Sequence, residues 1–155
     1  MHPTMLRRSA LALAASLTLL SATPASGAVR HEVMVTTHHN AKYGTFLVTM
    51  RGLVLYTYRA DKPNRSNCNG TCLAAWPALT VKKGVVPIGR GVKGIGVFRR
   101  TNGTFQVTWD KKPLYRFISD TKPYVVTGQG VAGFSLARLG VKRSTTTTTT
   151  GAYGN

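Results

Sequence analysis

Apolar and polar residues alternate in short runs through the middle of the chain, a pattern that is typical of β-strands. One β-hairpin is predicted over 44–58, where strand-forming residues flank a turn at positions 51–52. Another is predicted over 97–109, around a turn at 101–103 that ends in Asn-Gly. A short helical turn is predicted from Leu73 to Trp76, where the following proline ends it. The pattern therefore predicts a mainly β fold.

The first hairpin has a partner 59 residues further along the chain. Residues 44–61 and 103–120 align without a gap, with eight identities in 18 positions. Self-similarity at a fixed period indicates a repeated supersecondary unit. We therefore predict one small β domain over 43–139, made of two tandem hairpin-based repeats. The copies are repeat one, 43–80, and repeat two, 97–139.

Each of the two aligned segments ends on the motif Leu-Tyr-x-aromatic-x-x-Asp. Its tyrosine, second aromatic residue and aspartate are Tyr56, Tyr58 and Asp61 in repeat one, and Tyr115, Phe117 and Asp120 in repeat two. The aromatic residues are expected first of all to pack in the core or on a sheet, and each aspartate to accept bonds from its own turn. If the aromatic residues line a groove between the repeats instead, with Arg59 and Arg116 beside them, they could bind an anionic or aromatic ligand.

The N-terminal residues have the pattern of a cleaved secretory signal. Arg7 and Arg8 precede an apolar run of about 11 residues, and small residues follow as far as Ala28. That run is too short for a bilayer, which takes about 20 residues. We therefore predict a signal peptide over 1–28 and an extracytoplasmic protein, at the cell surface or in the periplasm. No cysteine lies near the cleavage point, so no lipid anchor is expected, and no later segment is apolar enough to span a membrane.

The segments that flank the predicted domain are expected to be mobile. Residues 29–42 are predicted to form a flexible N-terminal segment, and the threonine-rich residues 140–155 a disordered tail. The first of these segments contains three of the four histidines, His31, His38 and His39. Cleavage after residue 28 would put a histidine third, where an amine, two amides and an imidazole suit Cu(II). The other interpretation is a mobile end with incidental histidines.

Cys68 and Cys72 are the two cysteines of the chain. A disulfide is the default for an exported protein, so we predict that they are joined. The alternative, a thiolate metal site, would need further ligands. Only repeat one has cysteines, so the repeat does not need the disulfide in order to fold.

The charge of the chain indicates anionic partners. Of its 21 Lys and Arg residues, 19 remain after the predicted cleavage, against four Asp and Glu residues, which gives a net charge of +15. Outside the cytoplasm, an anionic envelope polymer or phospholipid is the expected partner, and nucleic acid is not. The basic residues are spread along the chain, so a solvated basic surface without a dedicated partner is an equal alternative.

The residues needed for common hydrolytic chemistry are scarce. Four acids offer few ways to place two carboxylates in one pocket. A Ser-His-Asp site would need a histidine inside the predicted domain, and every histidine precedes residue 40. The protein is therefore not expected to be an enzyme.

Five motifs in order resemble a family of bacterial secreted or lipoprotein repeats with a Tyr-x4-Asp motif, whose function is unknown. They are the two Tyr-x4-Asp elements, the segment from Ser66 to Pro77 with its two cysteines and Trp76, Gly103-Thr-x-Gln106-Val-Thr and Gly128-Gln-Gly130, and together they cover about residues 43–139. Members of this family often have a lipobox cysteine, and a tryptophan where this chain has Phe134. The resemblance implies an envelope protein and no catalytic residues.

The sequence leads to two hypotheses of function. The first is a non-catalytic envelope module, without a cofactor, with a binding or structural role towards anionic envelope components. The alternative is an extracytoplasmic copper- or haem-binding accessory protein, resting on His31, His38 and His39 together with Met34 and Met50.

Overall fold

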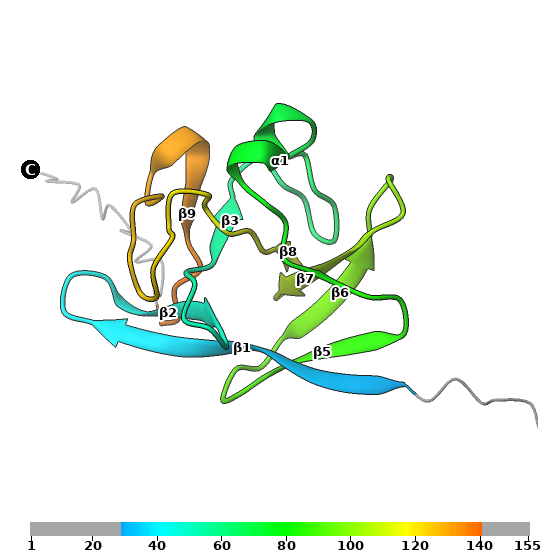
Figure 1. Cartoon of the computed structure of the whole chain (residues 1–155), viewed down its shortest axis with the longest axis horizontal. Helices are drawn as coiled ribbons and strands as arrows, with labels where there is room; N and C mark the ends of the chain where they lie inside the picture. Colours follow the sequence, from blue (N-terminus) through cyan, green and yellow to red (C-terminus); the bar gives the residue numbers. More distant parts are fainter. Residues whose placement is uncertain (1–28, 141–155) are drawn as a thin grey trace, which may run out of the picture.

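The computed structural model describes residues 29–140, a mainly β fold with one short helix and one 3-10 turn (Figure 1). The predicted fold class is confirmed. The predicted signal peptide, 1–28, and all but the first residue of the predicted tail lie outside the described residues. The strands are β1 (Arg30–Asn40), β2 (Gly44–Thr49), β3 (Tyr56–Tyr58), β4 (Thr80–Val81), β5 (Val85–Gly89), β6 (Ile95–Arg99), β7 (Phe105–Trp109), β8 (Lys112–Pro113) and β9 (Phe134–Leu136), and the helical segments are α1 (Thr71–Ala75) and η1 (Val131–Gly133).

The N-terminal segment is a strand, so the prediction of a flexible segment over 29–42 is wrong. β1 pairs along its first half with β5, in parallel, and along its second half with β2, antiparallel. Val35, at the change-over, is fully buried. The segment is held because both of its halves find backbone partners, one of them in the glycine- and lysine-rich connection between the repeats. Figure 1 shows β1 running beneath β2 and β5.

The second hairpin forms as predicted. β6 and β7 pair antiparallel from Ile95 opposite Trp109 to Arg99 opposite Phe105. The next turn, at Asp110-Lys111, has positive φ at both central residues, and it leads into β8, which pairs back onto β7. Positive φ at both positions matches the right-handed twist of adjoining strands.

The closing strand of each repeat pairs with the other repeat. β9, at the end of repeat two, pairs antiparallel with β3 of repeat one. β4, at the end of repeat one, pairs antiparallel with β7 of repeat two. Matched hydrogen bonds follow the same rule, from Ala137 N to Leu55 O at 3.0 Å and from Leu79 N to Leu114 O at 3.0 Å. Neither repeat completes its own sheet.

The hairpin of repeat one has a turn that is one residue longer than the turn in repeat two. The bridge from Val48 to Val54 corresponds to the pairing of Thr108 with Pro113, which encloses one residue fewer. The repeats therefore correspond with an offset of 60 in the strands before this turn, where Val48 matches Thr108, but of 59 after it, where Val54 matches Pro113 and the Tyr-x4-Asp motif follows. A shift by one residue moves a strand's side chains to the opposite face. Gln106, not Phe105, accordingly takes the buried position of Phe46.

The helical turn and the disulfide are both present as predicted. α1 covers Thr71–Ala75, about where the sequence places it, and Trp76 follows it with only 2% of its surface exposed. Cys68 and Cys72 are joined by a disulfide, with their Cα atoms 5.3 Å apart. The bridge closes the loop that leads into the helix.

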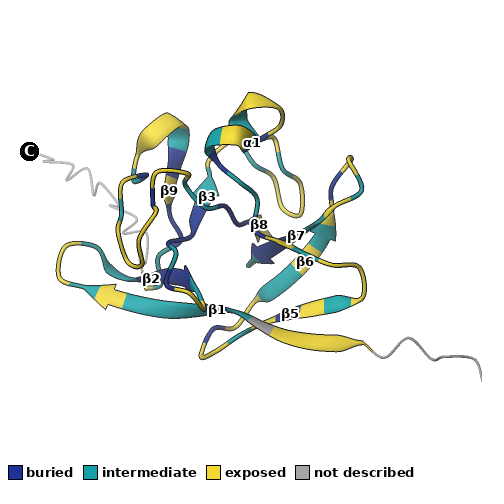
Figure 2. Cartoon of the chain, viewed as in Figure 1, coloured by how far each residue is buried: buried dark blue, intermediate teal, exposed yellow. Residues whose placement is uncertain are grey.

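Two clusters of buried apolar side chains form the core. One collects aromatic residues around β3 and β9, and the other collects aliphatic residues between β1, β2 and β7. Figure 2 shows these buried segments near the middle of the molecule, whereas the first residues of β1 are exposed. Fully burying one such side chain contributes about 1.5–3 kcal/mol.

Candidate functional site

The two Tyr-x4-Asp motifs meet at the centre of the molecule. Tyr56 N donates to Tyr115 O at 2.9 Å, and Tyr115 N donates to Tyr56 O at 3.0 Å. These are the same position in the two repeats. The reciprocal bonds therefore lie on an approximate twofold axis that relates repeat one to repeat two.

Each motif tyrosine is bonded to the aspartate of the other repeat. The Tyr56 hydroxyl donates to Asp120 Oδ2 at 2.6 Å, and the Tyr115 hydroxyl donates to Asp61 Oδ2 at 2.7 Å. Bonds to an ionised acceptor are shorter and stronger than neutral ones. The exchange of partners explains why tyrosine and aspartate recur at one spacing in both copies.

The second oxygen of each aspartate organises the loop that follows. Asp120 Oδ1 accepts bonds from Thr127 N at 2.9 Å and Thr127 Oγ1 at 2.6 Å. Asp61 Oδ1 accepts a bond from Asn67 N at 2.7 Å. The expected bonds from local backbone N–H groups are therefore made, but the other half of each carboxylate is used between the repeats.

Burial shifts the ionisation of these groups. Desolvation raises the pKa of the Tyr56 phenol, and the bond to Asp120 raises it further. Desolvation likewise raises the pKa of Tyr115. Both phenols therefore stay protonated and act as donors at neutral pH. Burial also raises the pKa of Asp61, against the opposing effect of its bonds from Asn67 and Tyr115.

The second aromatic residue of each motif forms one end of a stack of four rings. Tyr58 stacks on Phe134 with centroids 4.4 Å apart, Phe134 on Trp76 at 3.8 Å, and Trp76 on Phe117 at 4.3 Å. The stack obeys the same approximate symmetry, with the motif residues outside and Phe134 and Trp76 inside. Gly128 lies against it, since a Cβ there would be 2.7 Å from the Trp76 ring.

These contacts make the six motif residues a scaffold. Tyr56 and Tyr115 are fully buried and cannot form the wall of an open groove. Of the six residues, Phe117 and Asp120 reach the edge of a surface hollow of about 200 Å³, and Arg116 lines it beside them. The other suggested arginine, Arg59, is exposed and lies near Gly133.

The three histidines do not come together. His38 stacks on Tyr124 with centroids 4.0 Å apart, and His39 Nδ1 lies 3.1 Å from Thr45 Oγ1. His31 lies seven residues before His38 on β1, about 23 Å away at the rise of a strand. Within residues 29–140, no group of three or more His, Cys, Asp or Glu side chains is placed to hold a metal ion.

A hollow beside the disulfide loop gathers basic and amide side chains that the motifs do not single out. It has a volume of about 360 Å³, and its walls are Asn64, Arg65, Ser66, Asn67, Asn69, Phe98, Arg99, Arg100 and Thr101. We call it the arginine hollow. Repeat one supplies its first five residues and the β6–β7 hairpin of repeat two the rest. Sequence reasoning missed it because it joins loops about 30 positions apart.

Arg100 anchors the arginine hollow from within. Its guanidinium donates to Gln106 Oε1, to Cys68 O at 2.6 Å and to Asn69 Oδ1 at 3.0 Å, and the residue is only 6% exposed. All three acceptors are neutral. The disulfide loop and the second hairpin are therefore joined by a buried positive charge.

Comparison with known proteins identifies the repeat. The model of a family described as a secreted repeat of unknown function matches residues 37–80 and 96–135. The chain belongs to this family. The match covers two repeats, as the resemblance of the motifs indicates. The match begins within β1 in one copy and within β6 in the other.

The secreted repeat family has no described activity that could be transferred to this chain. No curated protein and no solved structure matches this chain. Among the residues that the structure describes, no helix is long and apolar enough to cross a membrane. The family description agrees with an extracytoplasmic location.

Proposed function

We propose that this secreted repeat protein is a non-catalytic module that binds an anionic polymer of the cell envelope. The observation that carries the proposal is the distribution of charge. Arg7, Arg8, Lys142 and Arg143 lie outside the described range, and of the other 17 basic residues all but Arg100, Arg116 and Arg138 are exposed.

The acidic residues do little to offset this surface. Asp61 and Asp120 are committed to the two motif tyrosines. Glu32, on β1, and Asp110, in the β7–β8 turn, are the remaining pair, and both are exposed. A surface with so large an excess of one sign attracts polyanions over a distance of about 10 Å at 0.1 M salt.

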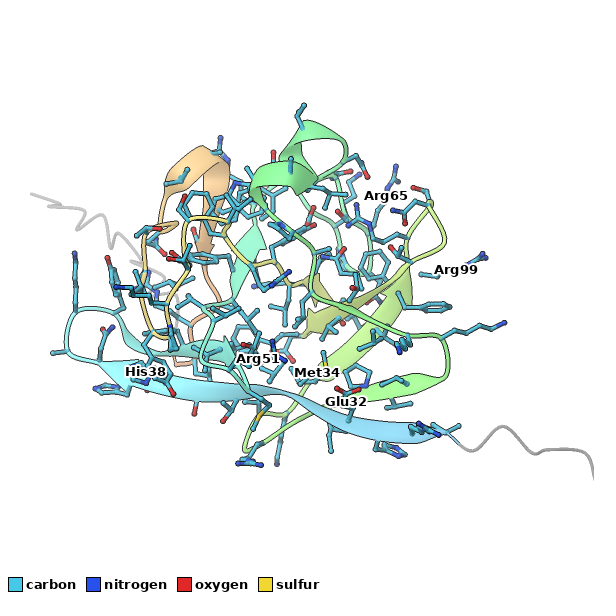
Figure 3. The ribbon with its side chains drawn as sticks, in the orientation of Figure 1. Glu32, Met34, His38, Arg51, Arg65 and Arg99 are labelled. Atoms are coloured by element: carbon cyan, nitrogen blue, oxygen red, sulfur yellow. A yellow bond between two sulfur atoms is a disulfide. The ribbon has the colours of Figure 1, made fainter. Side chains whose placement is uncertain are left out.

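The surface also supports an extended ligand, because five hollows follow one another along it. The first, beside Asp120, shares Leu53 and Arg116 with the second, and the second shares Glu32, Met34 and Thr80 with the third. The third shares Thr80 and Val81 with the fourth, and the fourth shares Arg99 with the arginine hollow. Figure 3 labels residues along this track, from Arg51 through Met34 and Glu32 to Arg99 and Arg65. A single small ligand would not use such a track.

The absence of catalysis is part of the proposal. The carboxylates of Asp61 and Asp120 are each anchored by a tyrosine and by a loop N–H group, so neither is free to act as a base. Neither motif phenol is available as a nucleophile, because burial raises its pKa. These features support a rigid scaffold.

The test is retention of the protein on immobilised poly(glycerol phosphate), on polygalacturonate and on neutral dextran. We expect retention on one or both anionic polymers at about 0.1 M salt and release towards about 1 M, where the Debye length is about 3 Å. Dextran should retain nothing. Equal retention on dextran, or no retention on either anionic polymer, would contradict the proposal.

One alternative keeps a specific observation in its favour. Met34 and Met50 line the same hollow, of about 330 Å³, next to Glu32. Thioethers are ligands for Cu(I), so this hollow supports a copper-binding role better than the separated histidines do. Titration with Cu(I) in competition with a colorimetric chelator tests it, using the variant Met34→Leu/Met50→Leu. Added haemin should give a shifted absorbance band if the haem version of the alternative holds.

A further inference from the structure

We propose that the arginine hollow is the site where a phosphate group of the envelope polymer binds, together with the sugar or polyol unit that carries it. This inference rests on the proposed function and names the chemistry at one point of it. The volume of about 360 Å³ lies in the range of ligand sites and would accommodate a phosphate with one such unit.

The buried guanidinium of Arg100 gives the hollow a fixed positive charge. Its hydrogen-bond partners are the side-chain oxygens of Gln106 and Asn69 and the carbonyl oxygen of Cys68, all of them neutral. The charge of Arg100 acts on the carboxylate of Asp61, but that carboxylate is bonded to Tyr115 and Asn67 and does not line the hollow. A buried charge without a bonded counter-ion favours an anionic ligand.

Two exposed arginines extend this charge to the solvent side. Arg65 and Arg99 line the same hollow, and Figure 3 shows them at the same end of the molecule. Guanidinium groups bind phosphate through paired N–H donors, and the bonds are charge-assisted. Arg99 also lines the adjoining hollow, so a polymer bound in the arginine hollow could extend into the next hollow of the series.

The remaining walls suit the unit that carries the phosphate. The exposed side chain of Asn64 offers an amide group for hydroxyl groups, and the half-buried Phe98 offers part of an apolar ring for C–H groups. Ser66 lies in the wall and also 2.7 Å from the Tyr115 hydroxyl oxygen, which ties the hollow to the motif. The hollow is therefore built on the rigid centre of the molecule.

The approximate symmetry separates a binding role from a folding role. The β1–β2 and β6–β7 hairpins correspond at an offset of 60, so the position of Arg100 in repeat two corresponds to Asn40 in repeat one. Asn40 accepts a bond from Tyr43 N at 2.8 Å within its own turn. The fold is therefore built around a neutral residue in one copy, so the hairpin itself does not require a guanidinium in the other.

The experiment compares the variant Arg65→Gln/Arg99→Gln with the control Arg90→Gln/Lys122→Gln. All four residues are exposed, and neither control residue lines the five hollows. Both variants lose two positive charges. Because all four side chains are exposed, thermal melts should show that both variants remain folded. We expect the affinity for soluble poly(glycerol phosphate) to fall roughly tenfold or more in the first variant and less than about threefold in the control.

Equal losses in the two variants would overturn this inference while the proposed function stands. A first variant that loses as much affinity for polygalacturonate as for poly(glycerol phosphate) would overturn the assignment to phosphate. A selective loss on phosphatidylglycerol vesicles, with none on the soluble polymer, would overturn the polymer in favour of a lipid head group. Failure of the unmodified protein to bind any of the polymers overturns the proposed function, and this inference with it.

Discussion

The hydroxyl of Tyr56 lies 2.6 Å from Oδ2 of Asp120, an aspartate 64 positions away in the other repeat. The symmetry-related bond joins Tyr115 to Asp61. The Tyr-x4-Asp motif therefore does not describe a contact within one repeat. Each copy supplies the tyrosine of one bond and the aspartate of the other, and both bonds join the two repeats.

Removal of either hydroxyl should destabilise the fold. Tyr56→Phe leaves Asp120, which is 6% exposed, without one of its donors, and Tyr115→Phe does the same to Asp61. We expect each to lower the free energy of unfolding by about 1–3 kcal/mol, the cost of an unsatisfied buried group. Urea denaturation monitored by tryptophan fluorescence measures it.

Tyr58→Phe is the matched control, because Tyr58 is half-buried and contributes its ring to the stack. A change of less than about 0.5 kcal/mol is expected, typical of a site away from a buried network. If all three variants unfold at the same urea concentration as the unmodified protein, the exchanged bonds do not stabilise the fold.

Acidification should stabilise the protein through Asp61. Its pKa is raised in the folded state, chiefly by burial, so the folded state binds the proton more readily than the unfolded state does. The contribution of Asp61 to stability therefore grows as pH falls through the raised folded value towards the unfolded value of about 3.9. As the pH is lowered from 7, the melting temperature of the unmodified protein should rise relative to that of Asp61→Asn. A difference that stays constant with pH would contradict the shift.

Neither repeat should fold by itself. β4 leaves repeat one to pair with β7, and β9 leaves repeat two to pair with β3. Fragments 29–92 and 93–140 should each lack the β-sheet circular dichroism signal, and an equimolar mixture should regain part of it. A cooperative thermal transition in one isolated fragment would show that the exchange of strands is dispensable.

Reduction of the disulfide should affect binding more than folding. A bridge across so short a loop contributes about 2 kcal/mol by the chain-entropy estimate, and repeat two has no counterpart. Cys68 O and the Asn69 side chain, both in this loop, hold Arg100. Cys68→Ser/Cys72→Ser should therefore remain folded and yet bind poly(glycerol phosphate) less tightly. Loss of the folded state in this variant, or unchanged affinity, would contradict the expectation.

Much of the fold could be predicted because it depends on local signals. The mainly β fold, the second hairpin and the helical turn before Pro77 all follow from residues near one another in the chain, and the duplication follows from identities between residues 44–61 and 103–120. The strand over Arg30–Asn40 could not, because one of its partners, β5, lies in a segment that carries no local strand signal, and its other partner, β2, is expected from the sequence to pair only with the residues that follow it. A glycine- and lysine-rich stretch has the composition of a connecting loop, and it forms a strand here because its backbone groups pair with those of β1.

The two repeats do not correspond at one fixed offset. Identities such as Phe46 with Phe105 align at an offset of 59. The extra residue between Val48 and Val54 raises the offset to 60 for the strands before that turn. The buried counterpart of Phe46 is therefore Gln106, whose amide donates to Leu114 O at 2.9 Å. A turn length that differs between copies cannot be seen in a gapless alignment, although it decides which face each side chain occupies.

The candidate site was less accessible to sequence reasoning than the fold. The motif residues stand out in the sequence because they recur, but Tyr56 and Tyr115 do not line the suggested groove, since they are buried and their bonds join the repeats. The arginine hollow unites Arg65 with Arg99 and Arg100 through the disulfide loop, and no spacing rule connects them. The clustering of histidines near the N-terminus suggested a metal site, but a strand spreads its residues along its length and over two faces.

The backbone bonds between Tyr56 and Tyr115 have a consequence for ancestry. In a chain with a single copy of the repeat, the same two bonds could form only between two molecules, around an exact dyad, and every substitution would be duplicated. Fusion of the copies releases them from that identity. In this chain one half has the cysteine loop and the other has the buried Arg100 opposite it, so the arginine hollow is a single asymmetric site on a frame of two similar halves.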